Sequence, residues 1–68
     1  MSLAIRLNGE QRDVREGTTV AELVVELALR PEAVAVERNG RLVRRAEHAR
    51  TALETGDRLE IVTLVGGG

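Results

Sequence analysis

The chain has 68 residues, 43% hydrophobic and 31% charged, and a net charge of −1 at pH 7. A chain of this length forms one small domain with a thin core, and because it contains no cysteine it has neither a disulfide nor a thiolate nucleophile. It also has no aromatic residue of the Phe, Tyr or Trp type, and its balanced charge argues against a nucleic-acid partner.

The first predicted elements form a β-hairpin. Hydrophobic residues alternate with others from Leu3 to Leu7, which is typical of a half-buried strand. Asn8-Gly9 follows, a strong hairpin signal. A second strand is predicted over 11–15, with Val14 facing inward.

A helix is predicted next, from the capping box Thr19-x-x-Glu22 to about Arg30. Its apolar residues fall at helical spacing and form one stripe: Val20, Leu23, Val24, Leu27 and Ala28. Pro31 is expected to end the helix, because the residue before a proline resists the α conformation.

The second half of the chain predicts three strands and a long loop. A strand is predicted around 34–37, followed by a turn at Asn39-Gly40 and a short strand at 42–43. A loop over 44–55 comes next, with a helical turn at 46–50 and with Leu53 in the core. The last strand is predicted over 58–64. The expected fold class is α+β: a β-grasp with a mixed sheet of four to five strands and one main helix across one face. The first and last strands should be parallel neighbours at its centre. Residues 1–65 form the predicted domain, and 66–68 a flexible glycine tail.

Catalytic and metal-binding residues are not predicted. His48 is the only histidine, no Ser, Cys or Lys stands near it as a nucleophile, and we interpret it as a surface or partly packed residue. No paired carboxylates or metal-ligand spacings occur, so no bound cofactor or metal is expected. No apolar run approaches the ~20 residues that span a bilayer, and no signal peptide is evident, which favours a cytoplasmic location.

The glycine run Gly66, Gly67 and Gly68 suggests a chemistry done to the protein. Residues without Cβ leave an unhindered carboxylate on a tail that reaches roughly 10 Å and fits a narrow channel. Activation by ATP would convert this carboxylate to an acyl-adenylate, and sulfide would then convert it to a thiocarboxylate. A frayed terminus is the alternative.

The ordered motifs resemble those of the thiamine-biosynthesis sulfur carriers of ThiS type, small relatives of ubiquitin and of the molybdopterin-synthase small subunit. The resemblance covers essentially the whole chain and rests on Asn8-Gly9, Gly17 to Leu23, Val34 to Gly40, Val43, Arg45, Glu47, Ala49, Gly56 to Val62, and Val65 to Gly68. Many relatives carry a proline where Arg44 stands and a tryptophan where His48 stands, so loop contacts are not carried over.

This resemblance implies a protein co-substrate rather than an enzyme. Gly68 would carry the adenylate and then the thiocarboxylate, while Gly66 and Gly67 would thread the active sites of partners. The implied partners are an ATP-using adenylating enzyme of the ubiquitin-activating type, a cysteine desulfurase or other sulfur donor, and thiazole synthase. Two alternatives stay open: another sulfur acceptor (molybdenum or tungsten cofactor, tRNA thiolation, cysteine synthesis), or a non-covalent β-grasp interaction module.

A docking patch is predicted next to the tail. Val62 and Leu64 should point out of the open face of the sheet, beside Ala4. The rim of this patch would be charged, formed by Arg6, Arg58 and Glu60. Ordinary sheet surface is the alternative interpretation.

Overall fold

A five-stranded mixed sheet forms the framework of the protein in the computed structural model, which describes residues 1–64. The elements are β1 (Ser2–Leu7), β2 (Glu10–Arg15), α1 (Val20–Glu26), the 3-10 helix η1 (Pro31–Ala33), β3 (Val34–Arg38), β4 (Arg41–Val43), the 3-10 helix η2 (Arg45–Arg50) and β5 (Arg58–Thr63). The strand order is β2-β1-β5-β3-β4, and only β1 and β5 run parallel. The predicted β-grasp with a central parallel pair is therefore confirmed.

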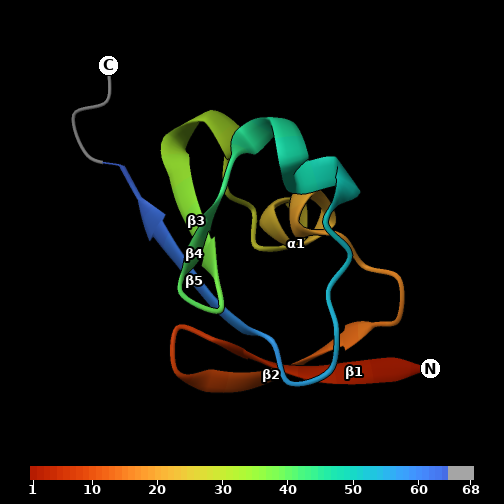
Figure 1. Cartoon of the computed structure of the whole chain (residues 1–68). Coiled ribbons are helices and arrows are strands. Elements are labelled where there is room, and N and C mark those ends of the chain that lie inside the picture. Colours follow the sequence, from red (N-terminus) through yellow and green to blue (C-terminus); the bar gives the residue numbers. More distant parts are fainter. Residues whose placement is uncertain (65–68) are drawn as a thin grey trace.

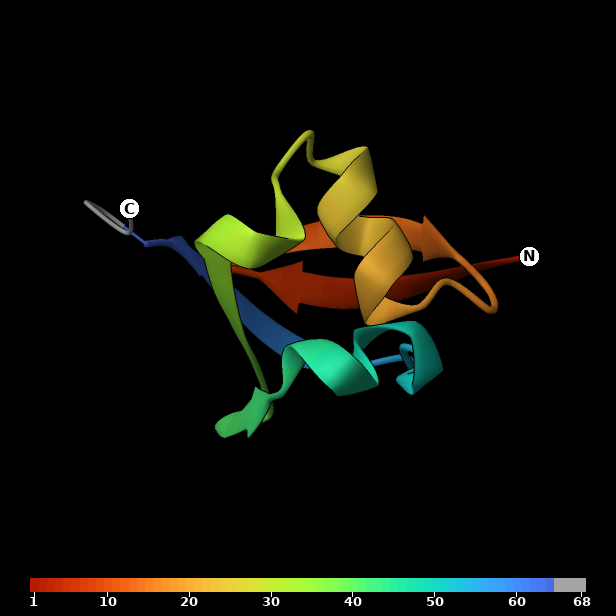
Figure 2. The ribbon, with the colours of Figure 1, turned by 90° about the horizontal axis from the view of Figure 1, so that it is seen from above.

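The sheet curves around α1, so that one face is covered and the other is open (Figure 1). The same arrangement seen from above shows α1 lying across the strands (Figure 2). The covered face holds an entirely aliphatic core, made of Ile5, Val14, Val20, Leu23, Val24, Val34, Val36, Leu53, Leu59 and Ile61. Leu53 reaches this core from the loop before β5, as its isolated apolar position predicted. Among residues 1–64, no helix has the length and apolarity that crossing a bilayer requires.

Helix α1 begins where the sequence predicts and ends earlier. The Glu22 N–H donates to Thr19 Oγ1 (3.2 Å), and the Thr19 N–H donates to Glu22 Oε1 (2.9 Å), which completes the capping box. The helix stops at Glu26, so the prediction of a helix to Arg30 is wrong.

Backbone geometry at Ala28, rather than Pro31, ends α1. Ala28 has a φ of 59°, in the left-handed region, and its N–H donates to Val25 O (2.9 Å). The Leu29 N–H donates to Val24 O (3.1 Å), which makes this end a Schellman motif. Glycine usually occupies the left-handed position, so an alanine there gave no stop signal in the sequence. Pro31 instead begins η1.

His48 is buried, with 4% of its surface exposed, so its interpretation as a surface or partly packed residue is wrong. The predicted helical turn in the loop is η2, and it packs against α1. This packing turns the imidazole inward, where His48 Nε2 lies 3.1 Å from Val43 O. In a chain without Phe, Tyr or Trp, this imidazole is the one aromatic ring that can fill such a space.

Candidate functional site

Strand β5 leads directly to the glycine run and therefore organises the candidate site. Leu59 and Ile61 point into the core, with 1% and 6% of their surface exposed. Val62 and Leu64 are 57% and 49% exposed, as predicted for the open face. Gly66, Gly67 and Gly68, together with the predicted boundary at residue 65, lie outside the described residues.

Ala4 does not lie beside Val62, and this part of the predicted patch is wrong. Arg6 pairs with Arg58 in the parallel β1–β5 register, and Ala4 O accepts a hydrogen bond from the Gly56 N–H (2.9 Å). Ala4 is therefore placed at the start of β5, whereas Val62 lies near its end.

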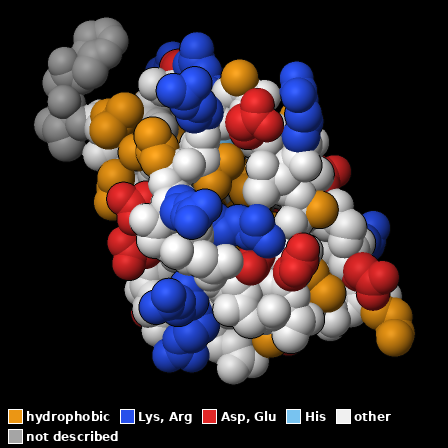
Figure 3. All heavy atoms as spheres, in the orientation of Figure 1, with side chains coloured by type: hydrophobic (Ala, Val, Ile, Leu, Met, Phe, Trp, Pro, Cys, Tyr) orange, Lys and Arg blue, Asp and Glu red, His pale blue; other side chains and the backbone are white. Residues whose placement is uncertain are grey.

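The neighbour of Val62 on the open face is Ala35 of β3, its direct cross-strand partner. Ala35 is half-buried and shares the outward direction, because Val34 and Val36 on either side of it are buried. Hydrophobic side chains gather at this end of β5 (Figure 3). The patch is therefore Val62, Leu64 and Ala35, a group that we call the β5 apolar patch.

Charged residues follow the β5 apolar patch toward the start of the strand. Arg6 lies opposite Arg58, and Glu60 lies opposite Glu37, so like charges face one another twice. Together with Gly9, Gly40 and Leu59 these four side chains line a shallow hollow of ≈ 190 Å³. Like charges opposite one another destabilise a sheet. Within residues 1–64 none of the four forms an ion pair shorter than 4.0 Å, so their charges are available to a partner.

The start of β5 is fixed by a buried carboxylate, Asp57, which is 5% exposed. Its Oδ2 accepts from Arg38 Nε (2.8 Å) and from the Glu54 N–H (2.8 Å), and its Oδ1 accepts from Asn39 Nδ2 (3.1 Å). Burial by itself raises the pKa of Asp57, but these hydrogen bonds and the Arg38 charge outweigh it and hold the pKa below its usual range.

Two asparagines hold β5 in a way that sequence reasoning missed. Asn8 and Asn39 have φ values of 52° and 54°, as expected in the two predicted hairpin turns. Their side-chain amides, however, bond to the backbone of β5. Asn8 reaches Ile61, and Asn39 reaches Arg58. The Asn-Gly motif predicted each turn, but no local pattern announces a partner 53 or 19 positions away.

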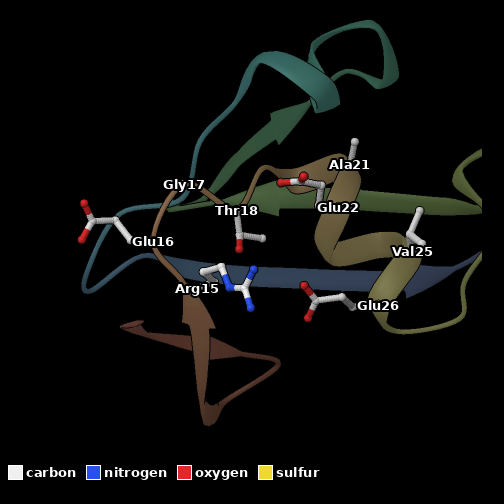
Figure 4. Close-up of a pocket in the computed structure, with 8 residues that line it drawn as sticks. All are labelled: Arg15, Glu16, Gly17, Thr18, Ala21, Glu22, Val25 and Glu26. Atoms are coloured by element: carbon white, nitrogen blue, oxygen red, sulfur yellow. The ribbon is translucent and has the colours of Figure 1, made fainter. Parts of the chain in front are cut away.

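A larger groove of ≈ 720 Å³ lies between the end of β2 and α1, away from β5. Figure 4 shows the guanidinium of Arg15 and the carboxylate of Glu26 turned toward one another across it. Glu22 on its wall is engaged in the helix cap. No group of three or more potential metal ligands occurs here or elsewhere in the described part of the chain.

These features define a class: a small ubiquitin-like β-grasp protein whose central strand ends in an outward apolar patch just before a glycine run. Comparison with known families then identifies it. The model of the ThiS family matches residues 5–68, and the chain belongs to that family.

Individual relatives agree with this assignment. The crystal structure of the thiamine biosynthesis protein ThiS from Geobacter metallireducens superposes with a TM-score of 0.82 at 32% identity, covering 97% of this chain and 100% of that one. A thiazole synthase from Magnetococcus marinus is 41% identical over 66 residues, which is 97% of this chain and 20% of that protein. A thiazole synthase from Paramagnetospirillum magneticum is 44% identical over 62 residues, 91% of this chain and 19% of that protein. The chain thus spans about a fifth of the length of these curated relatives.

Proposed function

We propose that this protein is a sulfur carrier for thiamine biosynthesis, charged as a thiocarboxylate at Gly68. The observation that carries the proposal is the extent of the family match, which runs through residue 68 and so includes the whole glycine run. The protein acts as a co-substrate, since the reacting group is its own carboxylate and the chemistry is supplied by its partners.

Charging proceeds in two steps. The Gly68 carboxylate oxygen attacks the α-phosphorus of ATP, which forms the acyl-adenylate and releases pyrophosphate. Hydrosulfide, or a persulfide supplied by a cysteine desulfurase, then attacks the carbonyl carbon. With hydrosulfide, a C–S bond forms, the C–O bond to AMP breaks, and a proton is released. With a persulfide, a reductant must afterwards cleave the S–S bond. Gly66 and Gly67 carry no side chain, so they would allow the tail to enter the active sites of the adenylating enzyme and of thiazole synthase.

Recognition of the folded part is assigned to the β5 apolar patch. Val62 and Leu64, which precede the glycine run in the sequence, expose about half of their surface, and burying such side chains on a partner is favourable by roughly 25 cal/mol per Å². Arg6, Arg58 and Glu60, which form no ion pair with any residue from 1 to 64, make up one edge of this surface, where their charges would favour a partner of complementary charge.

Thiazole synthase is the proposed sulfur acceptor. Two thiazole synthases contain a segment that is 41% and 44% identical to this chain, and this similarity supports thiazole synthase as the partner. A separate carrier would then bind the free enzyme in trans. We expect the purified, charged carrier to transfer its sulfur to thiazole synthase and not to a molybdopterin synthase large subunit. The reverse preference would reject the acceptor and keep the carrier.

The intact mass of the protein tests charging directly. After incubation with ATP, sulfide and an adenylating enzyme of the ubiquitin-activating type, we expect a shift that corresponds to replacement of one oxygen by sulfur. Deleting Gly68 should abolish the shift and leave the thermal unfolding temperature unchanged. An unshifted mass with an enzyme that charges another carrier would contradict the proposal, as would continued charging of the truncated chain.

A further inference from the structure

The second half of β5 lacks a strand on one side. The parallel β1–β5 pairing contains two register pairs, Arg6–Arg58 and Leu7–Leu59, and β1 then ends. The antiparallel pairing with β3 continues on the other side as far as Val34–Thr63. The part of β5 nearest the glycine run is therefore held by backbone pairing on its β3 side.

Asn8 occupies the place of the missing strand. Its N–H donates to Leu59 O (2.9 Å), its Oδ1 accepts from the Ile61 N–H (2.9 Å), and its Nδ2 donates to Ile61 O (3.2 Å). One side-chain amide thus satisfies both backbone groups of Ile61, as a neighbouring strand residue would. Figure 1 shows the β1–β2 turn beside β5 at this point.

The position of Ile61 makes these bonds consequential. Ile61 is 6% exposed, so without Asn8 its N–H and C=O would lose partners that water replaces poorly. The strand would gain stability by turning away from the sheet toward solvent. Such a turn would redirect Val62 and Leu64, whose exposed side chains form the β5 apolar patch.

We propose that Asn8 is a positioning residue for charging. Its amide holds the end of β5 in the sheet and so keeps Val62 and Leu64 in the orientation that docking on the adenylating enzyme requires. This inference rests on the proposed carrier function. A molecule whose β5 end has turned away cannot dock. The apparent affinity of the carrier for the adenylating enzyme is therefore reduced in proportion to the fraction of molecules that can dock. Loss of the Asn8 amide should therefore raise KM and leave kcat unchanged.

Asn39 provides a matched control at the opposite end of the same strand. Its N–H donates to Arg58 O (2.8 Å), and its Oδ1 accepts from the Arg58 N–H (2.9 Å). Asn8 and Asn39 share the left-handed backbone and precede a glycine with φ of 87° or 85°. Asn8→Gly and Asn39→Gly therefore both keep the turn and delete the amide, and Asn39→Gly in addition removes a hydrogen bond to Asp57 Oδ1.

The experiment measures charging by an adenylating enzyme with ATP and sulfide, as a function of carrier concentration, for both variants. We expect Asn8→Gly to raise KM about five- to tenfold at unchanged kcat, and Asn39→Gly to change KM less than about twofold. Amide hydrogen exchange at Ile61 should become at least about tenfold faster in Asn8→Gly and remain as in the wild type in Asn39→Gly.

Asn8→Asp keeps an oxygen acceptor for the Ile61 N–H and loses the donor to Ile61 O, so its KM should lie between those of the wild type and Asn8→Gly. If Asn8→Gly does not fold, the KM and the hydrogen exchange of Asn8→Asp test the proposal in its place. Equal KM values for the Asn8 and Asn39 variants, or unchanged exchange at Ile61, overturn the positioning assignment while the wild type still charges. A wild type that is not charged overturns the carrier function and this inference together.

Discussion

The two ends of β5 are built in opposite ways. At its start, the buried carboxylate of Asp57 collects hydrogen bonds from Arg38, Asn39 and a backbone N–H. At its end, Val62 and Leu64 expose 57% and 49% of their surface on the open face of the sheet. One strand thus passes from a fully bonded polar anchor to uncovered aliphatic side chains.

This difference separates stability from recognition along a single strand. A small domain has a thin core and little stability to spare, so a fixed anchor is needed where β5 joins the sheet. The other end can leave apolar surface uncovered because the inward residues of the strand, Leu59 and Ile61, are already buried in the aliphatic core. Substitution of the Asp57 anchor should therefore change unfolding, and substitution of the β5 apolar patch should change charging.

Asp57→Ala should produce the largest effect, on stability alone. It leaves Arg38, which is 27% exposed, and the Glu54 N–H without their acceptor, and such a loss costs about 2–3 kcal/mol. The unfolding temperature, followed by far-UV circular dichroism, should fall by roughly 10–20 °C. KM for charging of the folded protein should stay within about twofold of the wild type.

Asp13→Ala is the control for this substitution, because Asp13 lies exposed on β2 and makes no side-chain hydrogen bond to another described residue. Its stability should change by less than about 0.5 kcal/mol. Equal losses for the two aspartates would show that the anchor contributes nothing special.

Acid should weaken the same anchor. The pKa of Asp57 is lowered in the fold, so its stabilisation is fully present above the unfolded-state pKa of about 3.9 and is lost as the pH falls through the lower folded pKa. Urea unfolding between pH 5 and pH 2 should show a steeper loss for the wild type than for Asp57→Asn, which has no such proton to bind.

Glu32 sharpens the acid experiment. Its pKa is also lowered, first by a backbone hydrogen bond and then by Arg30, but the carboxylate lies on the surface. Exposed pairs contribute little, so Glu32→Gln should reproduce the wild-type pH profile. A profile flattened by Glu32→Gln rather than by Asp57→Asn would contradict the assignment of acid sensitivity to the start of β5.

Val62→Asp should raise KM for charging by about tenfold, because it places a charge in the centre of the proposed docking surface. Stability should change by less than about 0.5 kcal/mol, since the side chain is already exposed. Leu42→Asp is the matched control: Leu42 is 66% exposed on β4, away from the end of β5. A change at Leu42 as large as that at Val62 would reject the β5 apolar patch as the docking surface.

Much of this fold follows from short patterns. Alternation placed Ile5, Leu59 and Ile61 in the core, and the capping box located the first turn of α1. The end of α1 was mispredicted because Ala28 adopts a left-handed conformation that its side chain does not favour. Tertiary packing around Leu27 and Leu29, both partly buried, overrides the local preference there.

The site was less predictable than the fold, since it depends on strand register. The outward direction of Val62 followed from alternation, whereas its neighbour did not: the β1–β5 register moved Ala4 away, and β3 supplied Ala35. The contacts of Asn8 with Ile61 join residues 53 positions apart. No periodicity within one element contains that information.

The middle of β5 gives the smallest expected effect and tests whether its charges serve stability or recognition. Glu37 and Glu60 lie directly opposite one another, and like charges in that position are destabilising. Glu37→Arg should replace the repulsion by attraction and raise the free energy of unfolding by about 0.2–1 kcal/mol, with Glu37→Gln giving roughly half of the gain. Charging should respond differently: KM should stay within about twofold for both variants, because Glu37, unlike Glu60, is not part of the proposed docking surface. A gain in stability coupled to a several-fold rise in KM would instead extend the docking surface from Glu60 to Glu37, because the free protein would then carry the repulsion so that both carboxylates can meet a cationic partner.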